Sequence, residues 1–209
     1  MIREYTNSLV PENIEGKPVD IEKTVQRSSA EEALDTYNTA KTILLRPFLW
    51  QSLPGFEGAS FELEKADSAD ESGVMQKEDF IKIDIPGPGP HSGEGFDWVT
   101  VEMIEENFDP EADNSFGIMV RPCPEPANKR SNIAAHFFKD KATSTFIVKR
   151  IHNTVTAYYY GRNEVPNLKG ASLFDKLRNA FVSLGALAGI SNLQWKLLIN
   201  GLLKDDAKN

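Results

Sequence analysis

Hydrophobic residues recur along the chain with two periods, and the change of period marks where strands and helices are expected. Residues 19–26 alternate between apolar and polar side chains, which predicts a short strand with Lys23 intruding on its apolar side. Apolar side chains then follow helical spacing up to Pro47, after Ser28 and Ser29, either of which can cap a helix. The segment 19–47 therefore predicts a strand followed by a capped helix that ends near a proline.

Further alternating segments predict six antiparallel strands in the middle of the chain. They cover residues 59–66, 78–85, 97–108, 115–122, 142–151 and 154–162. Only His152-Asn153 separates the last two, which predicts a tight hairpin turn. Residues 133–138 form either a further strand or the beginning of the strand that follows them.

Leucines return at helical spacing near the C-terminus. Residues 172–189 predict a long amphipathic helix, a break is expected from Gly189 to Asn192, and residues 192–203 predict a second helix. A curved antiparallel sheet with one apolar face needs a cover, and the helix at 172–189 is the natural candidate. The predicted fold class is α+β, with a curved antiparallel sheet of about seven strands wrapped around a long C-terminal helix.

Three segments in this order resemble the helix-grip superfamily (SRPBCC), which includes START domains, the birch-pollen allergen and polyketide cyclases. VDIEKTVQRSSAEEALDTY resembles its first strand and capped helix, and RPFLWQSLPGFEGASFELEKAD resembles its second short helix and the entry into the sheet. STFIVKRIHNTVTAYYYGR resembles its penultimate hairpin, and the amphipathic C-terminal segment follows. The resemblance covers residues 19–190 and is one of pattern. The chain departs from it in the helix at 192–203 and in a Gly/Pro-rich loop after the third strand.

The resemblance implies an apolar cavity between the sheet and the long helix, and therefore the binding of a hydrophobic or lipid-like small molecule. The candidate lining residues are Val99, Val101, Met103, Ile118, Phe146, Val148, Tyr159, Leu177, Phe181 and Leu184. Arg162 is a candidate for an acidic head group, because arginine binds carboxylate or phosphate with two parallel hydrogen bonds. The alternative is that these side chains simply fill a solid core.

Charge and composition narrow the class of partner. The net charge of −8 disfavours binding to nucleic-acid phosphates. The single cysteine, Cys123, excludes an internal disulfide, and the sequence holds neither an apolar signal region nor a run of about 18 apolar residues. We expect a cytoplasmic protein with an N-terminal extension at 1–18, either loose or packed on the surface, and one domain at 19–209.

No motif in the sequence predicts a metal, a cofactor or a defined catalytic group. The loop at 86–95 has the glycines of a phosphate-binding loop, but three prolines remove N–H donors and a strand follows it, so we expect a semi-rigid loop. The three histidines lack zinc-site spacing. The acidic run from Asp109 has Asn114 and Val120 where a calcium loop needs glycine and glutamate.

Three functions stay open at this point. The first is binding of a hydrophobic molecule without chemistry, and the second is a cyclase, dehydratase or hydrolase that uses the same cavity with Tyr159, His136 or Arg162 as its titratable group. The third is a structural domain with a filled core that forms homo-oligomers through residues 192–203. A buried histidine or tyrosine with a shifted pKa beside a void favours the enzyme, whereas an interior without a void argues against ligand binding.

Overall fold

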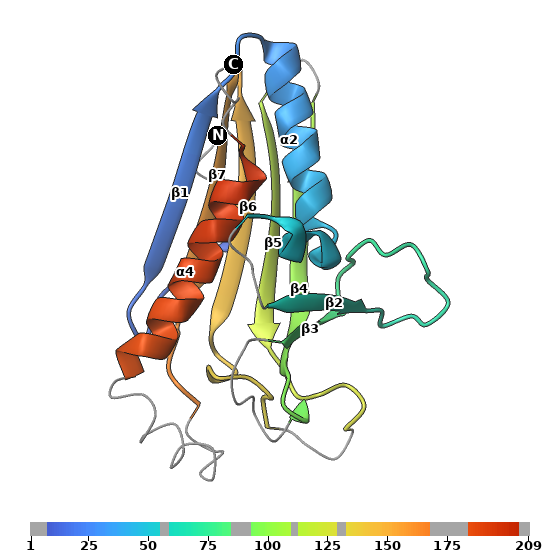
Figure 1. The fold of residues 1–209 in the computed structure, drawn as a ribbon, viewed down its shortest axis with the longest axis vertical. Helices are drawn as coiled ribbons and strands as arrows, with labels where there is room; N and C mark the ends of the chain where they lie inside the picture. The colour runs from blue at the N-terminus through green and yellow to red at the C-terminus, as the bar shows by residue number, and fades with distance from the viewer. Residues whose placement is uncertain are drawn as a thin grey trace.

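A seven-stranded antiparallel sheet forms the centre of the protein, with its strands in the order β1-β7-β6-β5-β4-β3-β2 (Figure 1). The structure is a computed structural model that describes residues 8–54, 59–84, 93–109, 113–128, 133–167 and 184–204, with the helix backbone alone at 184–192. The first strand, β1, pairs with the last strand, β7. β1 therefore forms one edge of the sheet, and β2 forms the opposite edge.

The strands agree with the predicted alternating segments. They are β1 (Val19–Gln26), β2 (Ser60–Glu64), β3 (Phe80–Asp84), β4 (Asp97–Asn107), β5 (Asn114–Pro122), β6 (Thr143–Ile151) and β7 (Thr154–Arg162). The predicted turn at His152-Asn153 joins β6 to β7, and His152 has a φ of 53°, as such two-residue turns require.

The prediction of a strand at 133–138 is wrong. Its pairing is limited to an isolated bridge between Phe138 and Pro166. The backbone hydrogen bonds of the segment go to several partners instead, because Ala135 bonds to Cys123 and Trp98 while the Phe137 carbonyl accepts from a residue beyond β7. The segment is therefore a loop that crosses one end of the sheet.

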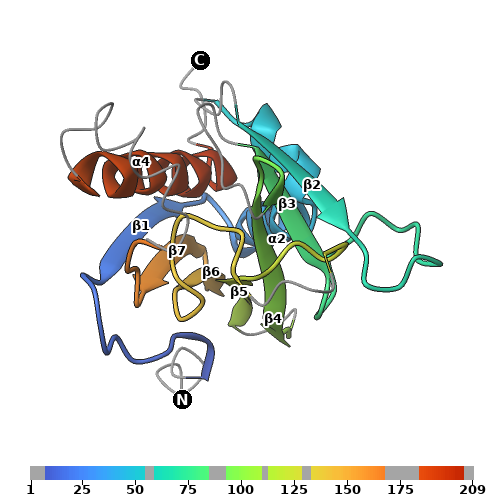
Figure 2. The same ribbon diagram turned by 90° about the horizontal axis from the view of Figure 1, so that it is seen from below.

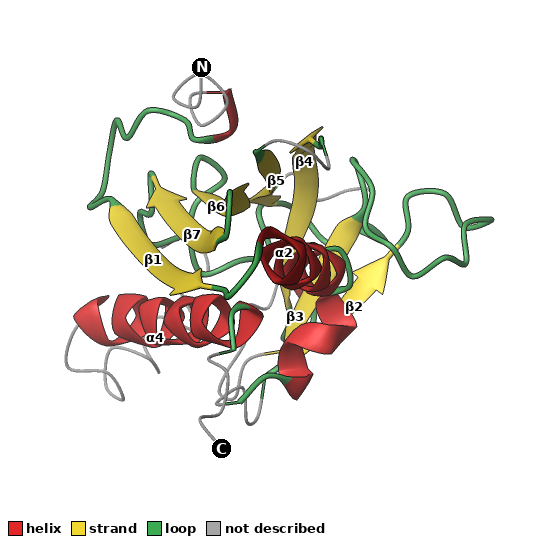
Figure 3. Cartoon of the chain, turned by 90° about the horizontal axis from the view of Figure 1, so that it is seen from above, coloured by secondary structure: helices red, strands yellow, loops and turns green. Residues whose placement is uncertain are grey.

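The helices lie on one face of the sheet, and the N-terminal segment lies on the other (Figures 2 and 3). The helix α2 (Ala30–Leu44) begins as predicted, because the Ser29 hydroxyl accepts a hydrogen bond of 3.1 Å from the backbone N–H of Glu32. The short 3₁₀ helix η1 (Pro47–Ser52) follows and buries Trp50. The helix α4 (Leu184–Leu202) packs against β1 and β7.

The C-terminal helix corrects one prediction. The expected break from Gly189 to Asn192 is wrong, because α4 continues through it, while residues 172–183 lie outside the described residues. Most apolar side chains of residues 192–203 are buried in the chain's own core, with Leu193 exposed, so the homo-oligomer through this segment stays a prediction. The buried side chains are Trp195, Leu198, Ile199, Leu202 and Leu203. Packing against the sheet outweighs the roughly 1 kcal/mol that a glycine costs inside a helix.

Aromatic rings fill the space between α4 and the sheet. Trp195 of α4 lies 5.2 Å from Phe146 and 5.6 Å from Tyr159, measured between ring centroids. Trp50 lies 5.6 Å from Phe146 and donates its indole N–H to the Ile43 carbonyl at 2.9 Å. These contacts join η1, the sheet and α4 into one core.

The N-terminal segment packs on the surface from residue 8 onward. Leu9 is buried against Met119 and Ile147 on the outer face of the sheet, and a Cβ atom on Gly117 would lie 2.6 Å from Leu9. Asn163 holds the segment further along, because its side-chain oxygen accepts hydrogen bonds from the backbone at residues 14 and 15. The expected division into residues 1–18 and 19–209 stays a prediction.

The predicted architecture is confirmed: the chain is α+β and has the helix-grip arrangement, with an antiparallel sheet that carries a C-terminal helix on one face. None of the helices within the described ranges has the length and apolar character needed to cross a membrane. The cytoplasmic location stays a prediction.

Candidate ligand site

A small cavity lies between the sheet, η1 and α4, beside the loop at 133–138. Among the described residues its volume is about 20 Å³, which is room for about one water molecule. Aromatic side chains supply much of its wall, namely Trp50, Phe137, Phe138, Phe146 and Trp195. His136 and Ser144 are its polar lining residues. Pockets for organic ligands are typically about 300–1,000 Å³, so a ligand must displace lining side chains.

The predicted lining residues divide into several groups. Val99 and Phe146 line the cavity. The next group is buried in the same core without lining the cavity: Val101, Ile118, Val148 and Tyr159. Leu177 and Phe181 lie outside the described residues, and Leu184 begins α4 with its side chain outside the description.

Met103 was predicted on the cavity side and lies on the opposite face. The register of β4 and β5 shifts between Val101 and Met103, because Glu102 is an extra residue of β4 there. One extra residue reverses which side chains face the core, so Ile104 packs against the core while Met103 packs in the outer cluster with Leu9. Simple alternation over 97–108 therefore failed at one bulge.

Arg162, predicted to bind an acidic head group of the ligand, does not lie with the cavity residues. Its guanidinium lies 2.6 Å from the Asp20 carboxylate and 5.3 Å from the centroid of the Tyr160 ring. Tyr160 belongs to the outer face, whereas its neighbour Tyr159 belongs to the core. Because alternate residues of a strand share a face, Arg162 lies on the outer face with Tyr160.

Tyr159 connects the core to a half-buried carboxyl group. Its hydroxyl donates to Glu164 Oε1 at 2.8 Å and lies 3.2 Å from the Ser144 hydroxyl. Burial and the neighbouring Glu164 raise the pKa of Tyr159 well above its ordinary value, and burial raises the pKa of Glu164. Gly161 makes room for this contact, because a Cβ atom there would lie 2.4 Å from the Glu164 carboxyl group.

His136 places a neutral imidazole in the cavity wall. Its Nδ1 accepts a hydrogen bond of 3.0 Å from the backbone N–H of Phe138, and its ring stacks on Phe137 at 4.3 Å. Burial lowers the pKa of His136 to about 3. A neutral ring whose Nδ1 is an acceptor carries its proton on Nε2, so His136 can donate a hydrogen bond to a bound molecule.

Asp97 holds the same loop from the start of β4. Its carboxylate accepts a hydrogen bond of 2.9 Å from the backbone N–H of Phe137. Burial raises the pKa of Asp97 to about 7, although the Phe137 hydrogen bond lowers it. We call Asp97, His136, Ser144, Tyr159 and Glu164 the cavity cluster, although only His136 and Ser144 line the cavity itself.

Sequence reasoning missed several members of this region. The sequence does indicate Asp97, because alternate residues of a strand share a face. Asp97 therefore shares the apolar face with Val99 and Val101 and is an acid there. Ser144 precedes Phe146 by two residues and carried the same kind of signal. Glu164 and Trp195 carried none, because their roles depend on how segments distant in sequence meet.

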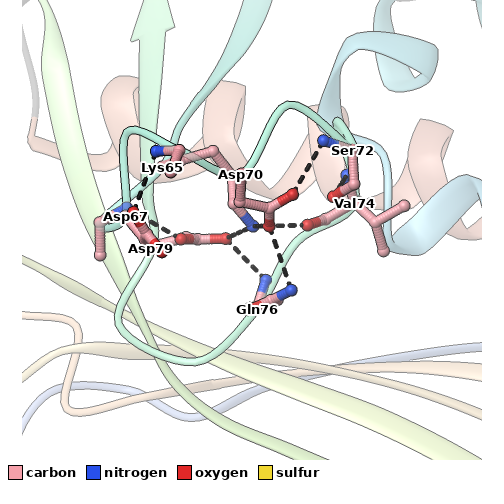
Figure 4. Close-up of polar contacts among 9 residues, drawn as sticks. Lys65, Asp67, Asp70, Ser72, Val74, Gln76 and Asp79 are labelled. Carbon is pink, nitrogen blue, oxygen red and sulfur yellow. Dashed lines mark hydrogen bonds and ion pairs between the residues drawn. The ribbon is translucent and has the colours of Figure 1, made fainter.

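A second polar cluster, with Asp79 buried at its centre, lies in the loop between β2 and β3 (Figure 4). Lys65 Nζ lies 2.6 Å from the Asp79 carboxylate, 2.7 Å from the Asp70 carboxylate and 2.8 Å from the Val74 carbonyl. Asp79 also accepts hydrogen bonds from the backbone N–H groups of Ala66 and Gln76. We call Lys65, Asp70 and Asp79 the loop cluster.

No group of three or more His, Cys, Asp or Glu side chains could hold a metal ion within the part of the chain that the structure describes. Burial raises the pKa of the Cys123 thiol to about 12, which keeps it protonated and unreactive at neutral pH.

The comparisons with known proteins find likeness in solved structures only. No protein-family model matches the chain, and no curated protein sequence matches it. Protein Ms6760 from Mycobacterium smegmatis is 12% identical, with 91% of this chain and 93% of that chain covered at a TM-score of 0.37. Ara h 8.0201 is 9% identical, with 88% and 100% covered at a TM-score of 0.33.

Truncated norcoclaurine synthase from Thalictrum flavum is 12% identical, with 91% of this chain and 99% of that chain covered at a TM-score of 0.32. The strand order and helix positions of this chain define its fold.

Proposed function

We propose that this chain binds a hydrophobic small molecule between its sheet and C-terminal helix, at the cavity beside the loop 133–138. The observation that carries the proposal is the composition of the cavity wall, where five aromatic side chains surround His136 and Ser144. Mostly apolar walls with a few polar groups are the usual chemistry of small-molecule sites. A solid core needs no buried histidine at this place.

The volume of about 20 Å³ sets a condition on this function. Binding must displace part of the wall, and Trp195 is the best candidate because its ring contacts Trp50, Phe146 and Tyr159 at once. If its ring moves, an opening forms between α4 and the sheet without any change in strand pairing. A pocket of this kind accepts flat apolar molecules.

The test uses N-phenyl-1-naphthylamine, an uncharged probe whose fluorescence rises in apolar surroundings. We expect saturable binding to the full chain and tighter binding to the variant Trp195→Leu, which enlarges the cavity. Leu193→Ala is the matched control, because Leu193 lies on the same helix and is 58% exposed. Absence of binding to both the wild type and Trp195→Leu overturns the proposal.

Native mass spectrometry of the chain, purified without denaturant, provides an independent measurement. We expect a fraction of the protein to carry a small molecule that organic solvent extracts. Replacement of Trp195 by leucine changes the bound fraction if the molecule occupies the cavity, whereas Leu193→Ala leaves it unchanged.

Acid–base catalysis in the same cavity is the second candidate function. The observation that favours it is the neutral, buried His136 in the wall, whose neighbour Phe137 donates its backbone N–H to Asp97, a carboxyl group with a pKa of about 7. A group with a pKa near the working pH is suited to move protons. The test is hydrolysis of 1-naphthyl acetate, in which water adds to the ester carbonyl and 1-naphthol leaves.

For this candidate the hydrolysis rate should rise with pH through about 7, as Asp97 ionises and becomes a base. The variant Asp97→Asn should lose that dependence, whereas Asp84→Asn, at an exposed position on β3, should retain it. Equal rates in the wild type and Asp97→Asn at every pH rule this candidate out.

A further inference from the structure

We propose that the ligand of this cavity is an uncharged aromatic molecule whose carbonyl oxygen accepts a hydrogen bond from His136 Nε2. The inference rests on the proposed binding function and specifies the chemical class of the ligand. It commits to a ketone or an ester carbonyl, in contrast to a pure hydrocarbon or an organic acid.

The direction of the hydrogen bond follows from the partner of the imidazole. The Phe138 backbone N–H is a fixed donor, so Nδ1 of His136 must be the unprotonated nitrogen. Burial keeps the ring neutral at physiological pH, since it lowers the pKa of His136 to about 3. The proton therefore lies on Nε2, which has no protein partner among the described residues.

Ser144 complements this donor. The Tyr159 hydroxyl donates its hydrogen bond to Glu164, so its oxygen accepts a hydrogen bond from the Ser144 hydroxyl. Ser144 then offers only lone pairs to a ligand. The cavity wall therefore combines a donor at His136 with an acceptor at Ser144, and both groups are uncharged.

The charge of the surroundings argues against an acidic ligand. None of the described side chains that line the cavity belongs to lysine, arginine, aspartate or glutamate. Burial of a carboxylate without a cationic partner is costly, and the neighbouring Asp97 and Glu164 are themselves acids. A neutral carbonyl avoids this cost and still pairs with the His136 proton.

Three probes of nearly equal shape separate these possibilities: 1-acetylnaphthalene, 1-ethylnaphthalene and 1-naphthoate. Each competes with N-phenyl-1-naphthylamine on the full chain at pH 7.5. We expect the ketone to bind about tenfold more tightly than the hydrocarbon, because the ketone accepts the Nε2 hydrogen bond, whereas a bound hydrocarbon covers this donor and leaves it unpaired. Naphthoate should bind more weakly than the ketone.

Variants assign the preference to His136. His136→Phe should reduce the ratio of the two affinities to about one, and His136→Gln, which keeps an N–H donor, should retain part of the preference. Ser144→Ala and Trp195→Phe are the controls within the same wall, and both should retain it. Circular dichroism and thermal unfolding verify that each variant folds.

The outcomes separate the inference from the function on which it rests. If N-phenyl-1-naphthylamine does not bind, the proposed function fails. If it binds but the wild-type affinities for the ketone and the hydrocarbon agree within about twofold, the inference alone is overturned. A preference that survives in His136→Phe and disappears in Trp195→Phe moves the donor to the Trp195 indole and also overturns it.

Discussion

Asp79 and Asp97 are both buried aspartates next to the sheet, and their surroundings differ. Asp79 is 2% exposed and is held by the Lys65 ammonium and two backbone N–H groups (Figure 4). Asp97 is 6% exposed and accepts its hydrogen bond from Phe137 N–H, with no cation in contact among the described residues. Similar burial therefore leads to a compensated charge in one place and to a pKa near neutrality in the other.

The contrast between these two aspartates extends to the groups around them. The loop cluster satisfies its buried charge completely, as a group that only supports a fold must. The cavity cluster leaves Asp97 without a cation and His136 Nε2 without a protein partner in the described part of the chain. Incomplete pairing next to an apolar cavity is a property expected of a binding site.

The largest effect is expected from removal of the compensated aspartate. Asp79→Ala should lower the free energy of unfolding by about 3–5 kcal/mol, because it leaves two backbone N–H groups without an acceptor and removes one of the two carboxylates that pair with the partly buried Lys65. Urea denaturation at pH 7 measures it. Glu71→Ala, at an exposed position in the same loop, should stay within about 0.5 kcal/mol of the wild type. A loss below about 1 kcal/mol for Asp79→Ala contradicts the role of the loop cluster.

A pH-dependent effect of about 2 kcal/mol is expected for Asp97. Because the folded-state pKa of Asp97 is raised to about 7, the folded protein binds this proton more tightly, and its stability falls as pH rises from 5 to 7. In Asp97→Asn this fall disappears, so the stability of the variant relative to the wild type increases by that amount. Urea denaturation at both pH values measures the difference.

The control for this experiment is Asp84→Asn, which changes an exposed aspartate on the neighbouring strand β3. Its stability relative to the wild type should be the same at pH 5 and pH 7. A parallel result for Asp97→Asn would show that the Asp97 carboxyl group ionises normally, and the contrast with Asp79 would disappear.

His136 should show a slightly smaller effect of opposite sign. Its folded-state pKa is lowered to about 3, so the folded protein resists protonation and its stability rises with pH up to about 6.5. In His136→Gln this rise disappears, and the stability of the variant relative to the wild type decreases between pH 5 and 6.5. The two variants should therefore diverge in opposite directions, and curves of the same sign contradict a neutral His136.

The smallest effect is expected from the outer member of the loop cluster. The hydrogen bond from Lys65 holds the pKa of Asp70 at about 2, so this pairing stabilises the fold above pH 4 and is lost as pH falls towards 2. Asp70→Asn should therefore lower stability slightly at pH 7, because the pair is partly exposed, and its difference from the wild type should vanish as pH falls towards 2. Added salt should reduce the difference, and a large loss at pH 7 contradicts this assignment.

Local patterns predicted the elements well where one face of the element is buried. The alternation in 154–162 placed Tyr159 in the core and its neighbours outside, and Ser29 capped α2 as its position indicated. Met103 was mispredicted because a bulge shifts the register of β4, and the break in α4 was mispredicted because the helix continues through Gly189. Of the predicted site residues, Val99 and Phe146 line the cavity.

The sequence by itself determined the order of strands and helices and the α+β class, because periodicity, capping and short connections act between near neighbours. Only the tertiary structure decided the candidate site. The bond between Asp97 and Phe137 joins residues 40 positions apart, and Trp195 reaches the same cavity from α4. No local sequence pattern predicts these long-range contacts, because burial and hydrogen-bond partners are set only when the loop and the helix pack against the sheet.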